Sequence, residues 1–153
     1  MADTPSWKHT QRFDLGEVTA STTNSALATG STVVNLATRS LPIQGGLLGN
    51  FGGATVVGTV STAITGAGGT VEIALQGSHD NSTWFNLIPG AAATTQNTFT
   101  VGATIAGRPS GALNQVAAAA FCGPLPQYIR GALLSGSTAP GAGKVTLNVI
   151  VIG

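Results

Sequence analysis

The sequence predicts one all-β domain, and three observations support that prediction. Glycine supplies 22 of the 153 residues and recurs every few positions, and a glycine inside a helix costs about 1 kcal/mol relative to alanine. Short runs of β-branched residues alternate instead with clusters of Gly, Ser, Asn and Pro, a pattern typical of strands and turns. Leu, Ile, Val and Phe make up about a quarter of the chain, enough for one core at this length. We therefore expect a single domain over residues 1–153.

About eight antiparallel strands are expected, at intervals typical of a sandwich or barrel. Residues 1–9 precede the first patterned run and contain Pro5, so we expect them to form an extended N-terminal arm. The Ala-rich run at 117–120 is followed by prolines and leaves room for at most one helical turn. The expected strands are residues 10–18, 31–38, 54–63, 70–77, 83–88, 97–101, 127–134 and 144–152.

The clearest alternation lies in residues 70–77, where Val71, Ile73 and Leu75 are aliphatic and alternate with Glu72, Ala74 and Gln76. A period of two predicts a strand with one buried face and one solvent face. The segment Gly-Ser-His-Asp-Asn-Ser at 77–82 favours a turn. Because residues 83–88 then return as a strand, these segments predict a hairpin.

The last expected strand, residues 144–152, has aliphatic residues at all of its odd-numbered positions from 145 to 151. Its even-numbered positions are polar until Ile150 and Ile152. One face is therefore expected in the core. The other face becomes apolar only at its far end, which predicts that this end enters an interface.

Charged residues make up 7% of the chain and the net charge is +1, whereas an average soluble domain is about 25% charged. Six basic residues are too few for electrostatic binding of nucleic acid. A weakly charged Gly/Ala/Thr surface suits a protein that is packed against other protein. The alternative is a monomer kept soluble by Thr, Ser, Asn and Gln.

No constellation of residues predicts a catalytic, cofactor or metal site. His9 lies in the arm and His79 lies beside Asp80 in a turn, and structural zinc needs about four ligands. The single cysteine, Cys122, has an apolar context that predicts a buried, inert thiol. We therefore expect neither an enzyme nor a small-molecule substrate.

The chain is expected to be made in a cytoplasm and not secreted. It has one cysteine, so no intrachain disulfide can form and an oxidising compartment is not needed. Its first residues lack the apolar region of a signal peptide. Its charge-free runs are interrupted by Gly, Ser and Thr, so no membrane span is expected.

Two stretches resemble jelly-roll proteins of tailed-phage virions. The first is TVEIALQGSHDNSTWFNLI, residues 70–88, with an apolar strand, Gln-Gly-Ser, a polar turn and Trp. The second is LPQYIRGALLSGSTAPGAGKVTLNVIVIG, residues 125–153, with a Tyr-Ile-Arg strand, a Gly/Pro/Thr loop and a Lys-Val-Thr strand. The chain is most similar to the Bordetella-phage-type capsid cement (decoration) family. The two stretches cover about a third of the chain.

The resemblance implies a jelly-roll β-sandwich that assembles as a homotrimer on the outer surface of a phage head, where it bridges major capsid protein subunits. It implies no catalytic residue. The alternative is a carbohydrate- or receptor-binding jelly-roll module of a phage tail or fibre, with Trp84, Phe85 and Tyr128 as stacking aromatics. Because Trp and Arg are enriched among interface anchors, the expected interface residues are Trp7, Arg12, Arg130, Ile150 and Ile152.

Overall fold

The computed structural model describes residues 10–20, 28–36, 53–66, 69–88, 98–100, 104–105, 108–109, 113–135 and 140–152. These residues form strands joined by turns, which confirms the predicted all-β fold. The strands in chain order are β1 (Thr10–Thr19), β2 (Ala28–Gly30), β3 (Val34–Asn35), β4 (Gly53–Thr65), β5 (Thr70–Ser78), β6 (Phe85–Asn86), β7 (Thr98–Thr100), β8 (Thr104–Ile105), β9 (Arg108–Pro109), β10 (Val116–Cys122), β11 (Tyr128–Ser135) and β12 (Ala142–Ile152).

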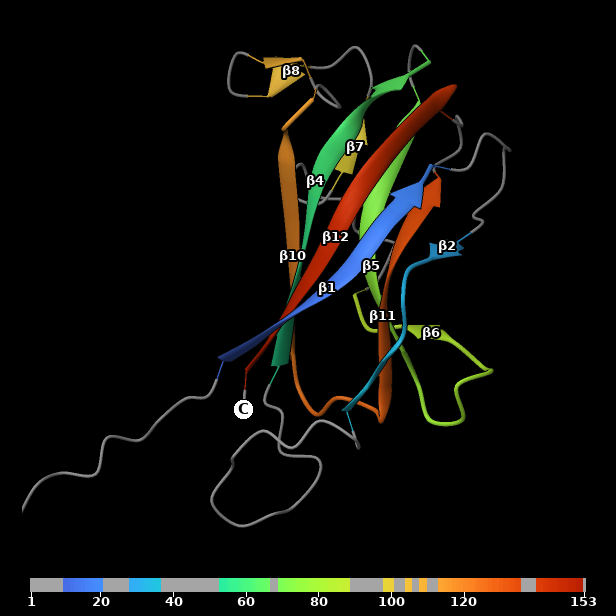
Figure 1. Ribbon diagram of the computed structural model, residues 1–153, viewed down its shortest axis with the longest axis vertical. Helices are drawn as coiled ribbons and strands as arrows, with labels where there is room; N and C mark the ends of the chain where they lie inside the picture. Colours follow the sequence, from blue (N-terminus) through green and yellow to red (C-terminus); the bar gives the residue numbers. More distant parts are fainter. Residues whose placement is uncertain are drawn as a thin grey trace, which may run out of the picture.

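Two antiparallel sheets pack face to face as a sandwich (Figure 1). The four-stranded sheet has the order β1-β12-β4-β10. The second sheet has the order β2-β11-β5-β6, and β3 and β7 add to β11 and β5 respectively. Strands β8 and β9 form a separate pair. The jelly-roll topology implied by the resemblance stays a prediction.

The core lies between the two sheets, where the inward side chains of β4, β12, β5 and β11 meet. The inward residues of β12 are fully buried, as the aliphatic odd-numbered positions predicted. The neighbouring strand β4 alternates in the same way over residues 54–60. The largest fully buried side chains are Leu15, Val56, Val60, Val71, Ile73, Leu75, Ile129, Leu133, Val145, Leu147 and Val149.

Strand β5 differs from the predicted half-buried strand, because it is buried on both faces. Ala74 is fully buried, and Glu72 and Gln76 are 8% and 6% exposed. The reason is its central place in the sheet, between β11 and β6. Arg130 from β11 and Asn86 from β6 both hydrogen bond to the Gln76 side chain, so neighbouring strands cover the face that the sequence assigns to solvent.

The Ala-rich run at 117–120 lies in strand β10, where the sequence predicted at most one helical turn. Its partner is β4, from Val116 opposite Thr59 to Cys122 opposite Gly53. Alanine is compatible with either conformation, so pairing with β4 decides. Two other boundaries also differ. Among the described residues of the strand expected at 31–38 only Val34–Asn35 form a strand, β3, and of the strand expected at 83–88 only β6 is observed. The predicted arm, residues 1–9, lies outside the described residues.

Gly58, in the middle of β4, generates a prediction about packing between the sheets. A Cβ atom built there would overlap Ile73 and lie 2.9 Å from Val145 Cγ1. Because overpacking a core costs about 1–3 kcal/mol, we expect Gly58→Ala to lower the free energy of unfolding by that amount in urea denaturation. The control is Thr59→Ala on the outer face, expected within about 0.5 kcal/mol of wild type. Equal stability of the two variants would contradict this packing.

Candidate interaction surface

The outer face of the four-stranded sheet brings together three of the predicted interface residues. The register places Ile150 between Arg12 of β1 and Thr55 of β4. Ile152 lies one outward position further along β12, opposite Thr10. Because outward residues recur every two positions, Arg12, Ile150 and Ile152 are neighbours on one surface.

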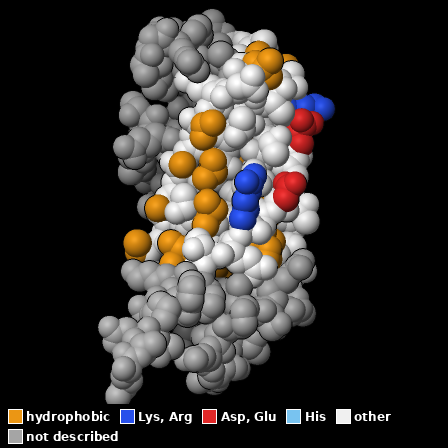
Figure 2. Space-filling view, turned by 60° about the vertical axis from the view of Figure 1, so that its left-hand side comes forward, with side chains coloured by type: hydrophobic (Ala, Val, Ile, Leu, Met, Phe, Trp, Pro, Cys, Tyr) orange, Lys and Arg blue, Asp and Glu red, His pale blue; other side chains and the backbone are white. Residues whose placement is uncertain are grey.

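One half of this face carries no charge and is mostly apolar, with Thr55 and Thr59 of β4 as its polar outward residues. Val116 is 58% exposed and Ile152 is 39% exposed. Figure 2 shows the apolar side chains gathered on one side of the face, with the charged ones beside them on the other. We call this surface the apolar half-face; it consists of Val57, Val116, Ala118, Ala120, Cys122, Ile150 and Ile152.

The charged residues occupy β1 and the opposite end of β12. Arg12 donates from Nε and Nη2 to Asn148 Oδ1, at 3.1 and 3.0 Å. The Asp14 carboxylate accepts from the backbone N–H of Gly16 at 2.9 Å. Gly16 has a φ of +81° and lies at a bulge in the β1–β12 ladder. Arg12 is therefore positioned at the border of the apolar half-face by its own sheet.

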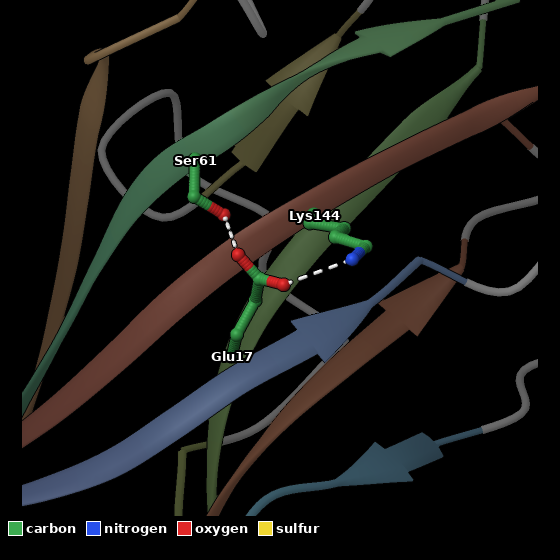
Figure 3. Close-up of polar contacts among 3 residues, drawn as sticks. All are labelled: Glu17, Ser61 and Lys144. Atoms are coloured by element: carbon green, nitrogen blue, oxygen red, sulfur yellow. Dashed lines mark hydrogen bonds and ion pairs between the residues drawn. The ribbon is translucent and has the colours of Figure 1, made fainter.

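A three-strand polar contact lies in this charged half (Figure 3). Ser61 Oγ of β4 donates to Glu17 Oε2 of β1 at 2.7 Å, and Lys144 Nζ of β12 lies 3.0 Å from Glu17 Oε1. The Ser61 hydrogen bond, followed by Lys144, lowers the pKa of Glu17. Both charged side chains are nearly half exposed, and exposed ion pairs contribute little stability. The contact chiefly holds the charged groups of Glu17 and Lys144 in place on the charged half of the face.

The β10 residues of this surface were missed by sequence reasoning, and the expected state of Cys122 was wrong. Cys122 is exposed, because it lies at an outward position at the end of β10, opposite Gly53. In Val-Ala-Ala-Ala-Ala-Phe-Cys the alternation is hidden, since alanine fits either an inward or an outward position. Only Phe121 is a large apolar residue that could have indicated which positions of this strand point inward, and it packs against the core.

The predicted interface residue Arg130 lies on the opposite sheet, apart from the residues above. Its guanidinium carbon is 4.1 Å from the Trp84 ring centroid, and its Nε donates to Gln76 Oε1 at 2.9 Å. Gln76 Nε2 in turn donates to Asn86 Oδ1 at 3.0 Å. Partial burial lowers the pKa of Arg130. The fifth predicted interface residue, Trp7, lies outside the described residues.

The turn before Trp84 is fixed by one carboxylate. Asp80 accepts from the backbone N–H groups of Thr83 and Ser82 at 2.7 and 2.8 Å and from Ser78 Oγ at 2.9 Å. These hydrogen bonds, the Thr83 N–H first, hold the pKa of Asp80 well below its usual range. The same turn carries Asn81 at a φ of +60°. Asp80 thus positions the segment that places Trp84 over Arg130.

Among the described residues, no group of three or more His, Cys, Asp or Glu side chains is placed to hold a metal ion. Within the same part of the chain, no helix has the length and apolar character needed to cross a bilayer.

No family model, no curated protein and no solved structure matches this chain. Its function therefore has to follow from the two surfaces themselves: the apolar half-face of one sheet and the Trp84–Arg130 cluster of the other.

The Asp80 turn generates a pH-dependent prediction. Because the pKa of folded Asp80 lies below its ordinary value of 3.8, its stabilisation is present above that pH and is lost as the pH falls through the folded pKa. We expect Asp80→Ala to lower the melting temperature by a constant amount above about pH 5, and by less as the pH drops below 3.8.

Thermal unfolding followed by circular dichroism across this pH range measures the effect. The control is Asp14→Ala, which removes an exposed carboxylate that accepts from the single N–H of Gly16 and should cost less. A wild-type to Asp80→Ala difference that grows on acidification would contradict the assigned role of the carboxylate.

Proposed function

We propose that this chain is a non-enzymatic structural protein of a tailed-phage virion, a capsid cement (decoration) protein. In this proposal it binds the outer surface of the head and stabilises the lattice of the major capsid protein. The observation that supports it best is the apolar half-face. The proposal assigns no catalytic residue, cofactor, nucleic acid or membrane partner.

The composition of the outer face fits a protein-binding role. Stable interfaces have an apolar centre depleted in charge and a polar rim. Here Val116, Ile150 and Ile152 supply exposed or half-buried apolar area, and Arg12 borders it while held by Asn148. This arrangement favours a broad protein partner.

The remaining parts of the proposal follow the resemblance of residues 70–88 and 125–153. They are a jelly-roll topology, assembly as a homotrimer, and a place on the capsid surface after synthesis in the host cytoplasm. The sandwich architecture agrees with them at the coarser level, since two antiparallel sheets enclose one core.

A binding experiment on phage heads tests the proposal. Heads of the encoding phage prepared without this protein are titrated with wild type and with Val116→Lys, and occupancy is measured by cryo-imaging and heat stability by DNA release. We expect wild type to bind and to raise heat stability. Val116→Lys should bind at least about tenfold more weakly, because burying an unpaired charge exceeds about 1.4 kcal/mol.

The matched control is Thr19→Lys, which adds the same charge to the charged half of the same sheet, opposite Lys144, and should bind as wild type does. Heads that show neither bound protein nor added heat stability would refute the cement function. Undiminished binding of Val116→Lys would remove the apolar half-face from it.

A second candidate function, a carbohydrate- or receptor-binding module of a tail or fibre, is favoured by the Trp84–Arg130 cluster. Phe85 is 40% exposed beside this cluster and its ring lies 5.6 Å from that of His79. Aromatic rings with adjacent polar groups are suited to sugars, whose faces are apolar and whose edges hydrogen bond. Arg130 already covers one face of Trp84, which leaves less stacking surface.

Glycan binding distinguishes the two functions. If the cement function holds, a glycan array probed with wild type gives no signal above that of Trp84→Ala. The second function would be established instead if wild type bound a glycan, Trp84→Ala bound it at least about tenfold more weakly, and Val116→Lys bound it as wild type does. A tenfold loss corresponds to about 1.4 kcal/mol of stacking energy.

A further inference from the structure

Strand β10 is the last strand of the four-stranded sheet in the described part of the chain. In the described part of the chain it pairs with β4 and with no other strand. It is seven residues long, within the usual range for a strand. An edge strand presents unpaired N–H and C=O groups that can accept a further strand.

A bulge at the start of β10 determines which backbone groups face this edge. Asn114, at a φ of +65°, donates its N–H to Val60 O, and Val60 N–H donates to Gln115 O, both at 2.9 Å. The Gln115 carbonyl therefore points to β4. Because backbone groups alternate direction along an antiparallel strand, Ala117, Ala119 and Phe121 also bond to β4. The outward groups belong to Val116, Ala118, Ala120 and Cys122.

The two edges of this sheet are built differently. The opposite edge, β1, carries Arg12, Asp14 and Glu17 and is interrupted by the bulge at Gly16, and charges and bulges are what natural edges use against unwanted pairing. Strand β10 has neither a charged residue nor a proline. Both edges carry a bulge, but the charges that protect the β1 edge are absent from β10.

We propose that β10 pairs antiparallel with β10 of a second copy of this chain, about a twofold axis at Ala119. Ala118 then faces the partner's Ala120, and Val116 faces the partner's Cys122. In each of these pairs both residues turn their N–H and C=O toward the new partner, so each pair exchanges two backbone hydrogen bonds. The result is one continuous eight-stranded sheet, four strands from each copy.

The second copy fits this edge because of symmetry. When the strand Val-Ala-Ala-Ala-Ala-Phe-Cys pairs antiparallel with a second copy of itself, every residue lies opposite a small or apolar residue. No two charged residues are brought together. An isologous contact satisfies the outward groups of both copies at once and closes at two. It also makes the two apolar half-faces continuous across the axis. The pairing does not depend on capsid binding.

Sedimentation equilibrium of the full chain tests the proposal. A dimer is expected for wild type, in place of the homotrimer that the resemblance implies. Ala118→Pro removes an N–H that faces the edge and none that β4 uses, and proline is tolerated at strand edges. We expect its circular dichroism spectrum to match wild type and its dimer dissociation constant to rise at least about tenfold. Ala118→Lys should act similarly, whereas Thr55→Lys, one strand inward on the same face, should not.

Disulfide trapping tests the register. Val116→Cys places a thiol opposite the partner's Cys122, and paired residues at this kind of position are about 5.5 Å apart between Cα atoms, within the range that a disulfide spans. Under mild oxidation we expect a covalent dimer on non-reducing gels. Ala118→Cys, two positions out of register, should cross-link at least about tenfold more slowly.

Three results would overturn the pairing. They are a wild-type monomer at micromolar concentration, a trimer whose dissociation Ala118→Pro leaves unchanged, and a dimer that is lost when residues 2–9 are deleted. Loss of the dimer on deletion of residues 2–9 would indicate that this arm, and not a second β10, pairs with the edge of β10. Because heads are absent from these measurements, failure of the cement function leaves the pairing intact, and the reverse also holds.

Discussion

The rest of the structure depends on the two-sided pairing of β12, the strand at the C-terminal end of the described chain. β12 pairs with β1 on one side and with β4 on the other, so strands from both ends of the sequence meet along it (Figure 1). Its inward side chains, from Val145 to Val151, are fully buried against the opposite sheet. With 7% charged residues, the chain has few ion pairs to rely on, and this buried face supplies the stabilisation.

The same alternation that buries one face of β12 determines the character of the other. Each outward position of β12 lies between an outward residue of β1 and one of β4. Polar residues of all three strands therefore gather at one end of the face, and apolar residues gather at the other. Glu17, Ser61 and Lys144 meet at one end, and Ile150 and Ile152 lie at the other. The proposed binding surface is thus formed by the same strands that form the core.

The second sheet is organised by polar contacts on its outer face. Gln76 is 6% exposed and bonds to Arg130 and Asn86, while Asp80 fixes the turn that brings Trp84 over Arg130. Buried polar side chains are stable only when hydrogen bonded, so this network is first of all part of the fold. The two outer faces therefore differ in kind: one has an uncharged half beside a charged half, and the other is held together by hydrogen bonds among Gln76, Arg130 and Asn86.

The sequence by itself determined the all-β fold, the strands at β5 and β12, and which face of β12 enters the core, because period-two patterns of large aliphatic residues specify both a strand and its faces. Only the tertiary structure decided that residues 117–120 form an edge strand and that Cys122 is exposed. It also decided that β5 is buried on both faces and that Arg130 and Arg12 lie on different sheets. These outcomes depend on partners distant in sequence, such as β4 for β10 and Arg130 for Gln76. The alanine side chain is too small to indicate which face of β10 is buried. The alternation within β5 does not indicate which side chains of neighbouring strands cover its outer face.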